Sequence, residues 1–214
     1  MKRFAYILFF CLLTVCGQAR EYADSAIWQG WNLKLDLATP VFELARSKGK
    51  VMAYEAAVNF NLLHRFYPTV ELGYGQAEAS AAGGDFSGMG GYGRIGLDLS
   101  ALRKNRIDNM LLVGVRLGTA VQGYKMDNVT VTDPYWGSYK SRDFAPAVRA
   151  DVWGEVVGGV QVKVYGPFHM GWFFRLRFLF TRKETGAANA YYIPGYGYRD
   201  EMNYGFNYYI GLKF

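Results

Sequence analysis

The sequence is poor in the residues that build metal centres and disulfide scaffolds. Its 214 residues include only two Cys and two His, too few for a zinc cluster or a framework of several disulfides. Six Pro stand against 26 Gly, and the Gly do not recur at every third position, which excludes a collagen-like chain. Hydrophobic residues make up 51% of the chain, too many for a disordered protein. The length fits one domain, or at most two small ones.

Long apolar runs are also missing beyond the first segment of the chain. Residues 4–16 are apolar, follow Lys2 and Arg3, and lead into a stretch with small residues, a pattern typical of a secretory signal peptide. The run is shorter than the roughly 20 residues that a membrane-spanning helix needs. We therefore predict a signal peptide over residues 1–19 and a mature domain over residues 20–214.

Cleavage at this point would remove both cysteines and two positive charges from a chain whose formal net charge is +6. A chain without thiols cannot misoxidise in an oxidising compartment. A lipoprotein remains an alternative, because residues 13–17 around Cys16 loosely resemble a lipobox. The other basic residues are scattered among acids without a basic stripe, so we expect no nucleic-acid partner.

Beyond residue 30 the sequence alternates between apolar and polar residues. In Trp31–Leu37 every second residue is apolar and the residues between are polar, a period of two that is typical of a β-strand with two different faces. Eight segments alternate in this way: 31–37, 52–61, 69–75, 94–100, 111–122, 151–164, 172–181 and 203–214. An even number of strands lets an antiparallel sheet close on itself. The sequence therefore predicts an all-β, eight-stranded antiparallel barrel.

The predicted connections differ in length. They contain about 12, 6, 11, 9, 26, 4 and 19 residues, with boundaries good to about 2–4 residues, so every odd-numbered connection is longer than its neighbours. Outer-membrane barrels have short periplasmic turns and longer outer loops. We therefore expect loops 123–148 and 182–200 to lie outside the cell. Their Tyr and Trp residues would form a contact surface for an extracellular or envelope protein, or else a folded cap or an aromatic girdle.

The polar face of the strands indicates whether the inside or the outside of the barrel carries the polar residues. It combines glycines such as Gly73, Gly96 and Gly114 with charges of both signs. Glycine weakens a strand on a solvated face, whereas inside a narrow barrel it leaves room for long charged neighbours. We therefore predict paired charges that close the lumen. The candidate network comprises Glu55, Glu71, Arg94, Asp98, Arg116, Glu155, Arg175 and Arg177. The same face carries Lys34, Asp36, Asp151, Lys163 and Lys213.

Two other kinds of barrel remain open at this point. A gap in the charged network would make the protein a narrow pore for ions or small solutes. A soluble lipocalin-like barrel would instead turn the apolar face inward around a ligand. The preferred interpretation is a small outer-membrane barrel with a structural or surface-interaction role.

Aromatic residues favour the outer membrane. Trp31, Tyr54 and Tyr74 lie near strand ends on the apolar face, where amphipathic rings suit a bilayer interface. The last strand carries apolar and aromatic residues at alternate positions, a pattern that resembles the signal by which barrel-assembly machinery recognises its clients. The candidate assembly residues are Tyr208, Ile210, Leu212 and Phe214. We expect outer-membrane lipid and this machinery as partners.

No catalytic or metal centre is expected. Acyl transfer needs a base, usually His, beside a nucleophile, but His64 and His169 fall at short turns that we place on the periplasmic rim. Gly88–Gly93 resembles a phosphate loop only superficially, because no helix follows it. The aspartates of loop 123–148 could hold Ca²⁺, but their spacing matches no EF-hand. We expect neither an enzyme nor a cofactor.

Several short stretches carry a further signal. The most specific is Tyr192–Gly197, in which Gly follows Pro as a tight turn requires. The others are residues 66–74, 92–98, 113–118 and 171–177. In these stretches the chain resembles an uncharacterised outer-membrane β-barrel family of Bacteroidota, described as a domain of unknown function. The resemblance implies the outer membrane of a Gram-negative bacterium, reached through a signal peptide, and it implies no activity.

Overall fold

The fold was analysed in a computed structural model of the chain. It describes residues 27–37, 39, 50–63, 65–81, 84–101, 109–133, 135, 137–140, 144–181 and 190–214. The predicted signal peptide, Cys16 and His64 lie outside these residues. Within the part of the chain that is described, no helix is both long and apolar enough to cross a membrane.

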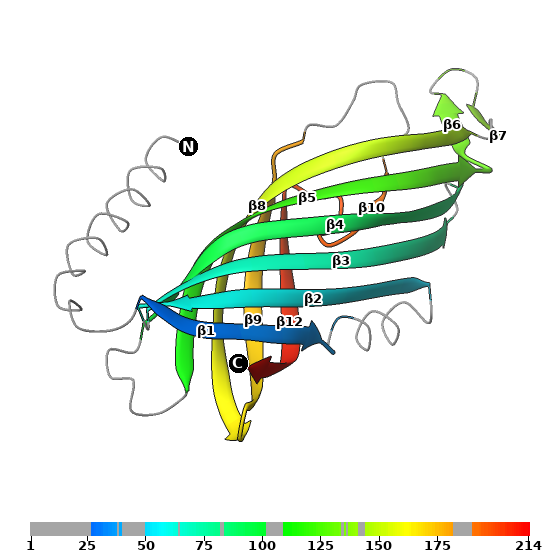
Figure 1. The fold of residues 1–214 in the computed structure, drawn as a ribbon. Coiled ribbons are helices and arrows are strands. Elements are labelled where there is room, and N and C mark those ends of the chain that lie inside the picture. The colour runs from blue at the N-terminus through cyan, green and yellow to red at the C-terminus, as the bar shows by residue number, and fades with distance from the viewer. Residues whose placement is uncertain are drawn as a thin grey trace, which may run out of the picture.

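The described elements are β-strands. In chain order they are β1 (Trp28–Asp36), β2 (Val51–Leu62), β3 (Phe66–Ala81), β4 (Gly84–Ser100), β5 (Met110–Asp127), β6 (Thr130–Asp133), β7 (Gly137–Lys140), β8 (Phe144–Tyr165), β9 (Phe168–Leu179), β10 (Tyr192–Ile193), β11 (Gly197–Tyr198) and β12 (Met202–Lys213). Eight of them form a closed barrel in the order β1-β12-β9-β8-β5-β4-β3-β2 (Figure 1). Every neighbouring pair is antiparallel. The predicted eight-stranded antiparallel sheet is confirmed.

The alternation of the sequence becomes an alternation of burial. Along β5, buried and exposed residues succeed one another without interruption from Met110 to Val121. Buried positions point into the barrel and exposed positions point out, because successive side chains of a strand lie on opposite faces. Arg116 is therefore inside, while Val115 and Leu117 lie on the outer surface.

The first and last strands close the ring. Leu33 lies opposite Leu212 in the register between β1 and β12. The backbone N–H of Trp31 donates to the Phe214 carbonyl at 3.1 Å, and the N–H of Phe214 donates to the Trp31 carbonyl at 2.9 Å. The two rings stack with centroids 4.5 Å apart. Both ends of the described chain thus lie at the end of the barrel where β2, β4 and β8 finish, at Leu62, Ser100 and Tyr165, which we call the turn end.

At the opposite end, the loop end, the predicted connection lengths need correction. Alternation of long and short connections fails between β3 and β4, because Ala81 pairs with Gly84 and only two residues separate the strands. The glycine-rich stretch Gly88–Gly93 belongs to β4 rather than to a loop. The sequence signal was weak there because glycines occupy both faces of the strand. One of them, Gly90, lies so close to Gln122 and the Val121 carbonyl that a Cβ atom would clash.

The expected loop 123–148 is mostly strand. β5 runs to Asp127 and β8 starts at Phe144, and between them lies the hairpin β6–β7. Figure 1 shows β3, β4, β5 and β8 running on toward this hairpin at the loop end. Tyr135 lies between β6 and β7, at the tip of this hairpin. Its described side chain is 94% exposed.

Candidate functional site

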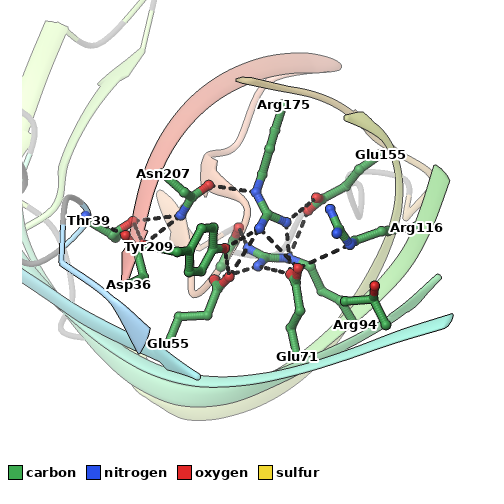
Figure 2. Close-up of polar contacts among 12 residues, drawn as sticks. Asp36, Thr39, Glu55, Glu71, Arg94, Arg116, Glu155, Arg175, Asn207 and Tyr209 are labelled. Atoms are coloured by element: carbon green, nitrogen blue, oxygen red, sulfur yellow. Dashed lines mark hydrogen bonds and ion pairs between the residues drawn. The ribbon is translucent and has the colours of Figure 1, made fainter. Parts of the chain in front are cut away.

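The eight candidate network residues all come together inside the barrel. Glu55 lies on β2, Glu71 on β3, Arg94 and Asp98 on β4, Arg116 on β5, Glu155 on β8, and Arg175 and Arg177 on β9. Seven of them are buried, and Arg177 is partly buried. Figure 2 shows acids and guanidinium groups meeting at the centre of the lumen from opposite walls. The network therefore links strands that are not neighbours in the sheet.

Arg175 is at the centre of this network. Its Nη1 lies 2.8 Å from Glu71 Oε2 and 3.0 Å from Glu155 Oε2. Its Nη2 lies 3.2 Å from Glu55 Oε1 and also donates to the Tyr209 hydroxyl. Nε donates to Asn207 Oδ1 at 2.5 Å. One guanidinium group thus has all of its nitrogens engaged, as a buried arginine requires.

Arg94 and Arg116 complete the pairing of the same acids. Arg94 Nη1 lies 2.5 Å from Glu55 Oε2 and 2.9 Å from Glu71 Oε2, and its Nε lies 2.8 Å from Glu155 Oε1. Arg116 Nε lies 3.0 Å from Glu71 Oε1, and its Nη2 lies 2.7 Å from Asp98 Oδ2. The contacts of the Nη atoms are charge-assisted hydrogen bonds, which are the strong ones in proteins.

The arrangement bears on the chemistry that the acids can perform. Glu55 and Glu71 are diagonal rather than opposite, because Glu55 pairs with Gly73 and Glu71 with Ala57. Each carboxylate contacts at least two arginines. A catalytic pair needs two carboxyl groups that are free to act on a substrate, whereas here both carboxylates are shared among buried guanidinium groups. These contacts connect β9 with β2 and β3 across the lumen, as a cross-link would.

Glycines on the inner face make room for these long side chains. A Cβ atom at Gly114 would meet the Asp98 carboxylate, and one at Gly96 would meet the Arg116 side chain. A Cβ atom at Gly205 would meet the Arg177 guanidinium. The polar face is thus rich in glycine because the charged neighbours fill the space that side chains would occupy.

A second buried cluster lies closer to the loop end. Asp151 Oδ1 is 3.2 Å from Arg149 Nε and 2.5 Å from Arg199 Nη2. Of these three residues, the alternation of the sequence predicts only Asp151 inside. Arg149 could have been found, since it lies two residues before Asp151 and therefore on the same face. Arg199 belongs to the connection between β9 and β12, where no periodic signal exists.

Two lysines expected inside lie at the turn end of the barrel. Lys163 is exposed and Lys213 is partly exposed, although each is in register with a buried residue, Lys163 with His169 and Lys213 with Asn32. Both lysines therefore belong to the inner face, as expected, and lie at its rim. Lys34, by contrast, is buried, with its ammonium group 5.1 Å from the ring centre of Phe173.

The segment 190–201 favours the folded-cap alternative over an exposed aromatic contact surface. Ile193 and Tyr196 are fully buried and pack with Trp153 in one cluster, and Tyr192 is buried as well. The small hairpin β10–β11 folds inward at the loop end, where Figure 1 shows it behind the strands of the barrel wall. Tyr191, at 53% exposed, is the outward exception.

The network holds this inward segment in place. Arg94 Nη2 donates to the Gly195 carbonyl at 2.6 Å, and Arg177 Nη1 donates to the Tyr196 carbonyl at 2.9 Å. Gly195 has a φ of +76° and lies against the Tyr92 ring, so only glycine fits there without strain. Burial raises the pKa of the Tyr196 phenol, whose hydroxyl donates to the Asp200 carbonyl at 2.5 Å.

His169 is placed differently from the prediction. It lies on β9 rather than in the turn, its side chain is buried, and Nδ1 is 2.9 Å from the Pro167 carbonyl oxygen. The cavity beside it has a volume of about 10 Å³, room for about one water molecule. Among the residues that are described, no group of three or more His, Cys, Asp or Glu could hold a metal ion.

Comparison with known proteins gives a family. No curated protein matches the sequence. Among solved structures, the chain is similar to the crystal structure of Neisserial surface protein A (NspA), with 10% identity, a TM-score of 0.46, and coverage of 87% of this chain and 98% of that one. A family described as a domain of unknown function (DUF6048) matches residues 1–213. The chain therefore belongs to the DUF6048 family.

Proposed function

We propose that the protein is an outer-membrane β-barrel whose lumen is closed by the buried charge network and by the inward segment 190–201, and which acts through its surface. The observation that carries this proposal is the reversed polarity of the barrel wall. Its inner face buries arginines and glutamates in contact with one another, while large hydrophobic residues are exposed outside. Lipid is the solvent that such an outer face suits.

The outer face carries aromatic rings at two levels. Tyr54 and Tyr74 are register partners, and Trp28 packs against Phe60 near the turn end. From Tyr54 to Phe60 is roughly 20 Å along β2, at about 3.4 Å per residue. Barrel strands tilt by about 35–45°, which reduces this separation to a height of roughly 15 Å, within the apolar band of about 25 Å that outer-membrane barrels have.

A soluble ligand-binding barrel fits less well. Such a barrel needs apolar side chains around its ligand, and here the centre of the lumen is occupied by ion pairs. A pore also fits less well. Below the inward segment, the two cavities next to Lys34 have volumes of about 10 Å³ each, and Arg175 reaches across to acids on three other strands.

The proposed partners follow from this location. Barrel-assembly machinery would recognise the last strand through Tyr208, Ile210, Leu212 and Phe214. An extracellular or envelope protein would meet the β6–β7 hairpin at the loop end. The proposal includes export through the predicted signal peptide and implies no catalytic activity.

Membrane fractionation combined with a heat-modifiability gel tests the proposal. A closed membrane barrel stays folded in detergent and migrates differently before and after boiling. We expect the protein in the outer-membrane fraction with such a shift, and no channel events in a planar bilayer. Recovery as a soluble protein without a shift would contradict the membrane location. Steady channel conductance would contradict the closed lumen and favour the pore.

A further inference from the structure

Lys34 differs from the other buried charges of the lumen. The eight residues of the central network are four acids and four arginines, which contact one another. Lys34 lies on the same inner face and is 6% exposed, but its ammonium group forms no ion pair or hydrogen bond with the residues that the structure describes. Its charge contacts the ring of Phe173 instead. Lys34 therefore adds a positive charge that the network does not balance.

The acids around Lys34 are engaged elsewhere. Glu71 lines a second small cavity beside Lys34, but its carboxylate contacts three arginines. Asp36 lies two residues further along the same face, and its carboxylate accepts a hydrogen bond from Asn207 Nδ2. An ammonium ion that leaves water without a counter-ion loses more free energy of hydration than a cation–π contact returns. Lys34 must therefore either lose its proton or bind an anion.

The cavity beside His169 lies against this lysine. Lys34, Asn32 and Gln161 line the cavity, and none of the three is more than 6% exposed. Gln161 Nε2 is buried and has no hydrogen-bond partner among the described residues, so its N–H groups can donate. The Asn32 amide can present its NH₂ group, because the amide can turn over and exchange its nitrogen and oxygen. Three donor groups thus border a volume of about 10 Å³, which fits a water molecule or a monoatomic ion but no phosphate or carboxylate.

Two more lysines lie at the rim of the same end of the barrel. Lys163 is in register with His169, and Lys213 is in register with Asn32. Each rim lysine therefore lies opposite a residue that lines the cavity. A recess bordered by charges of one sign raises the local concentration of counter-ions. These lysines at the turn end thus favour an anion over a cation.

We propose that the cavity beside His169 is a halide site, in which chloride is the counter-ion of Lys34. The Lys34 ammonium group and Gln161 Nε2 donate to the ion, and the Asn32 amide turns its NH₂ group toward it. Phe173 forms an apolar part of the wall. Donors without a carboxylate suit an anion, whereas Ca²⁺ and Mg²⁺ need oxygen ligands. The inference adds a ligand to the proposed closed lumen, and it rests on the fold rather than on the membrane location.

Unfolding in chloride and in gluconate tests the site. The full-length mature barrel is unfolded by urea in detergent, in sodium chloride or sodium gluconate of equal ionic strength, so that the screening of charges is the same. A ligand that binds only the folded state raises the midpoint as its concentration rises. We expect chloride to raise the urea midpoint, and Lys34→Met to reduce that rise at least fivefold. In gluconate, Lys34→Met should unfold at the same urea concentration as the unsubstituted protein or a higher one, because it removes an unbalanced charge.

Two further variants and a second measurement sharpen the test. Lys125→Met is the matched control, because it removes a half-exposed lysine at the loop end, and it should keep the full chloride effect. Gln161→Leu keeps Lys34 but removes a donor, and it should reduce the chloride effect at least twofold. It also tests the site if Lys34→Met does not fold. In crystals grown in sodium bromide, we expect an anomalous-scattering peak between Lys34 and Gln161.

The outcomes separate this inference from the membrane proposal. A heat-modifiability gel shows whether each sample is a folded barrel. For a folded barrel, a urea midpoint that does not respond to chloride, an equal response of Lys34→Met, or a cavity without a bromide peak would overturn the halide site and indicate a neutral Lys34. A soluble protein without a gel shift would reject the membrane location, and the same titrations in detergent-free buffer would still decide the site.

Discussion

The Arg175 guanidinium lies among three glutamates that come from three different strands, and none of the four residues is more than 5% exposed. Such a group stabilises a fold only while it is complete, because an unpaired buried charge has lost its hydration without gaining a partner. The acids lie on β2, β3 and β8, so removing the arginine weakens contacts on both sides of the lumen.

Arg175→Met should therefore lower the free energy of unfolding by about 3–5 kcal/mol. The measurement is urea unfolding of the detergent-folded barrel, followed by tryptophan fluorescence. Lys125→Met is the control, since the ion pair of Lys125 with Asp127 is half-exposed and should contribute less than about 1 kcal/mol. Equal midpoints for the two variants would show that the central pairs do not stabilise the barrel.

Two glycines of the wall should respond differently to the same substitution. A Cβ atom at Gly114 would collide with the Asp98 carboxylate, whereas one at Gly158 has open space around it. Gly114→Ala should destabilise by about 1–3 kcal/mol through overpacking, and Gly158→Ala should be neutral or slightly stabilising. Urea midpoints of the two variants decide this, and a loss at Gly158 as large as that at Gly114 would contradict the inner-face account.

At the scale of elements, the proposed closure of the lumen has two parts in series. The hairpin β10–β11 covers the loop end, where Tyr196 packs edge-on against Trp153 with ring centres 5.8 Å apart. The charge network lies below it. Removing the upper part should wet the residues beneath it without opening a continuous path.

Replacing residues 191–198 with a Gly-Ser linker should therefore expose Trp153 but give no channel. In a variant that keeps Trp153 as its single tryptophan, acrylamide quenching should rise severalfold over the same variant with the hairpin intact. Planar-bilayer recordings should remain silent for both. Stable conductance after the replacement would show that the hairpin alone closes the lumen, which would give the network a purely structural role.

At the scale of the whole molecule, closure depends on one seam. β1 and β12 share the five register pairs from Asn32–Lys213 to Asp36–Tyr209, and the seam ends in the stack of Trp31 on Phe214. At the other end of the seam, the Asp36 carboxylate accepts a hydrogen bond from Asn207 Nδ2 at 2.6 Å. β1 is also among the shortest of the eight wall strands.

Phe214→Ala should reduce the fraction of protein that reaches the heat-modifiable form in the outer membrane, by severalfold in cells. The variant removes the ring stack and alters the proposed assembly signal together. Tyr165→Ala is the control, because Tyr165 is an aromatic residue at the turn end that is 85% exposed. Normal assembly of Phe214→Ala would show that neither the stack nor the terminal aromatic is needed.

The sequence by itself determined the strands and the orientation of their side chains. Period-two alternation needs only local geometry, since neighbouring side chains of a strand must point to opposite faces. It therefore located eight strands and put residues such as Glu71 and Arg94 on the buried face. It missed the glycine-rich start of β4, where glycines occupy both faces of the strand.

Only the tertiary structure decided what the buried charges contact and what fills the loop end. The stagger of the strands around the ring decides which arginine contacts which glutamate. Arg175 contacts Glu71 although the two residues are 104 positions apart in the sequence. The inward fold of Tyr196 and the pairing of Arg199 with Asp151 depend on space left by distant walls.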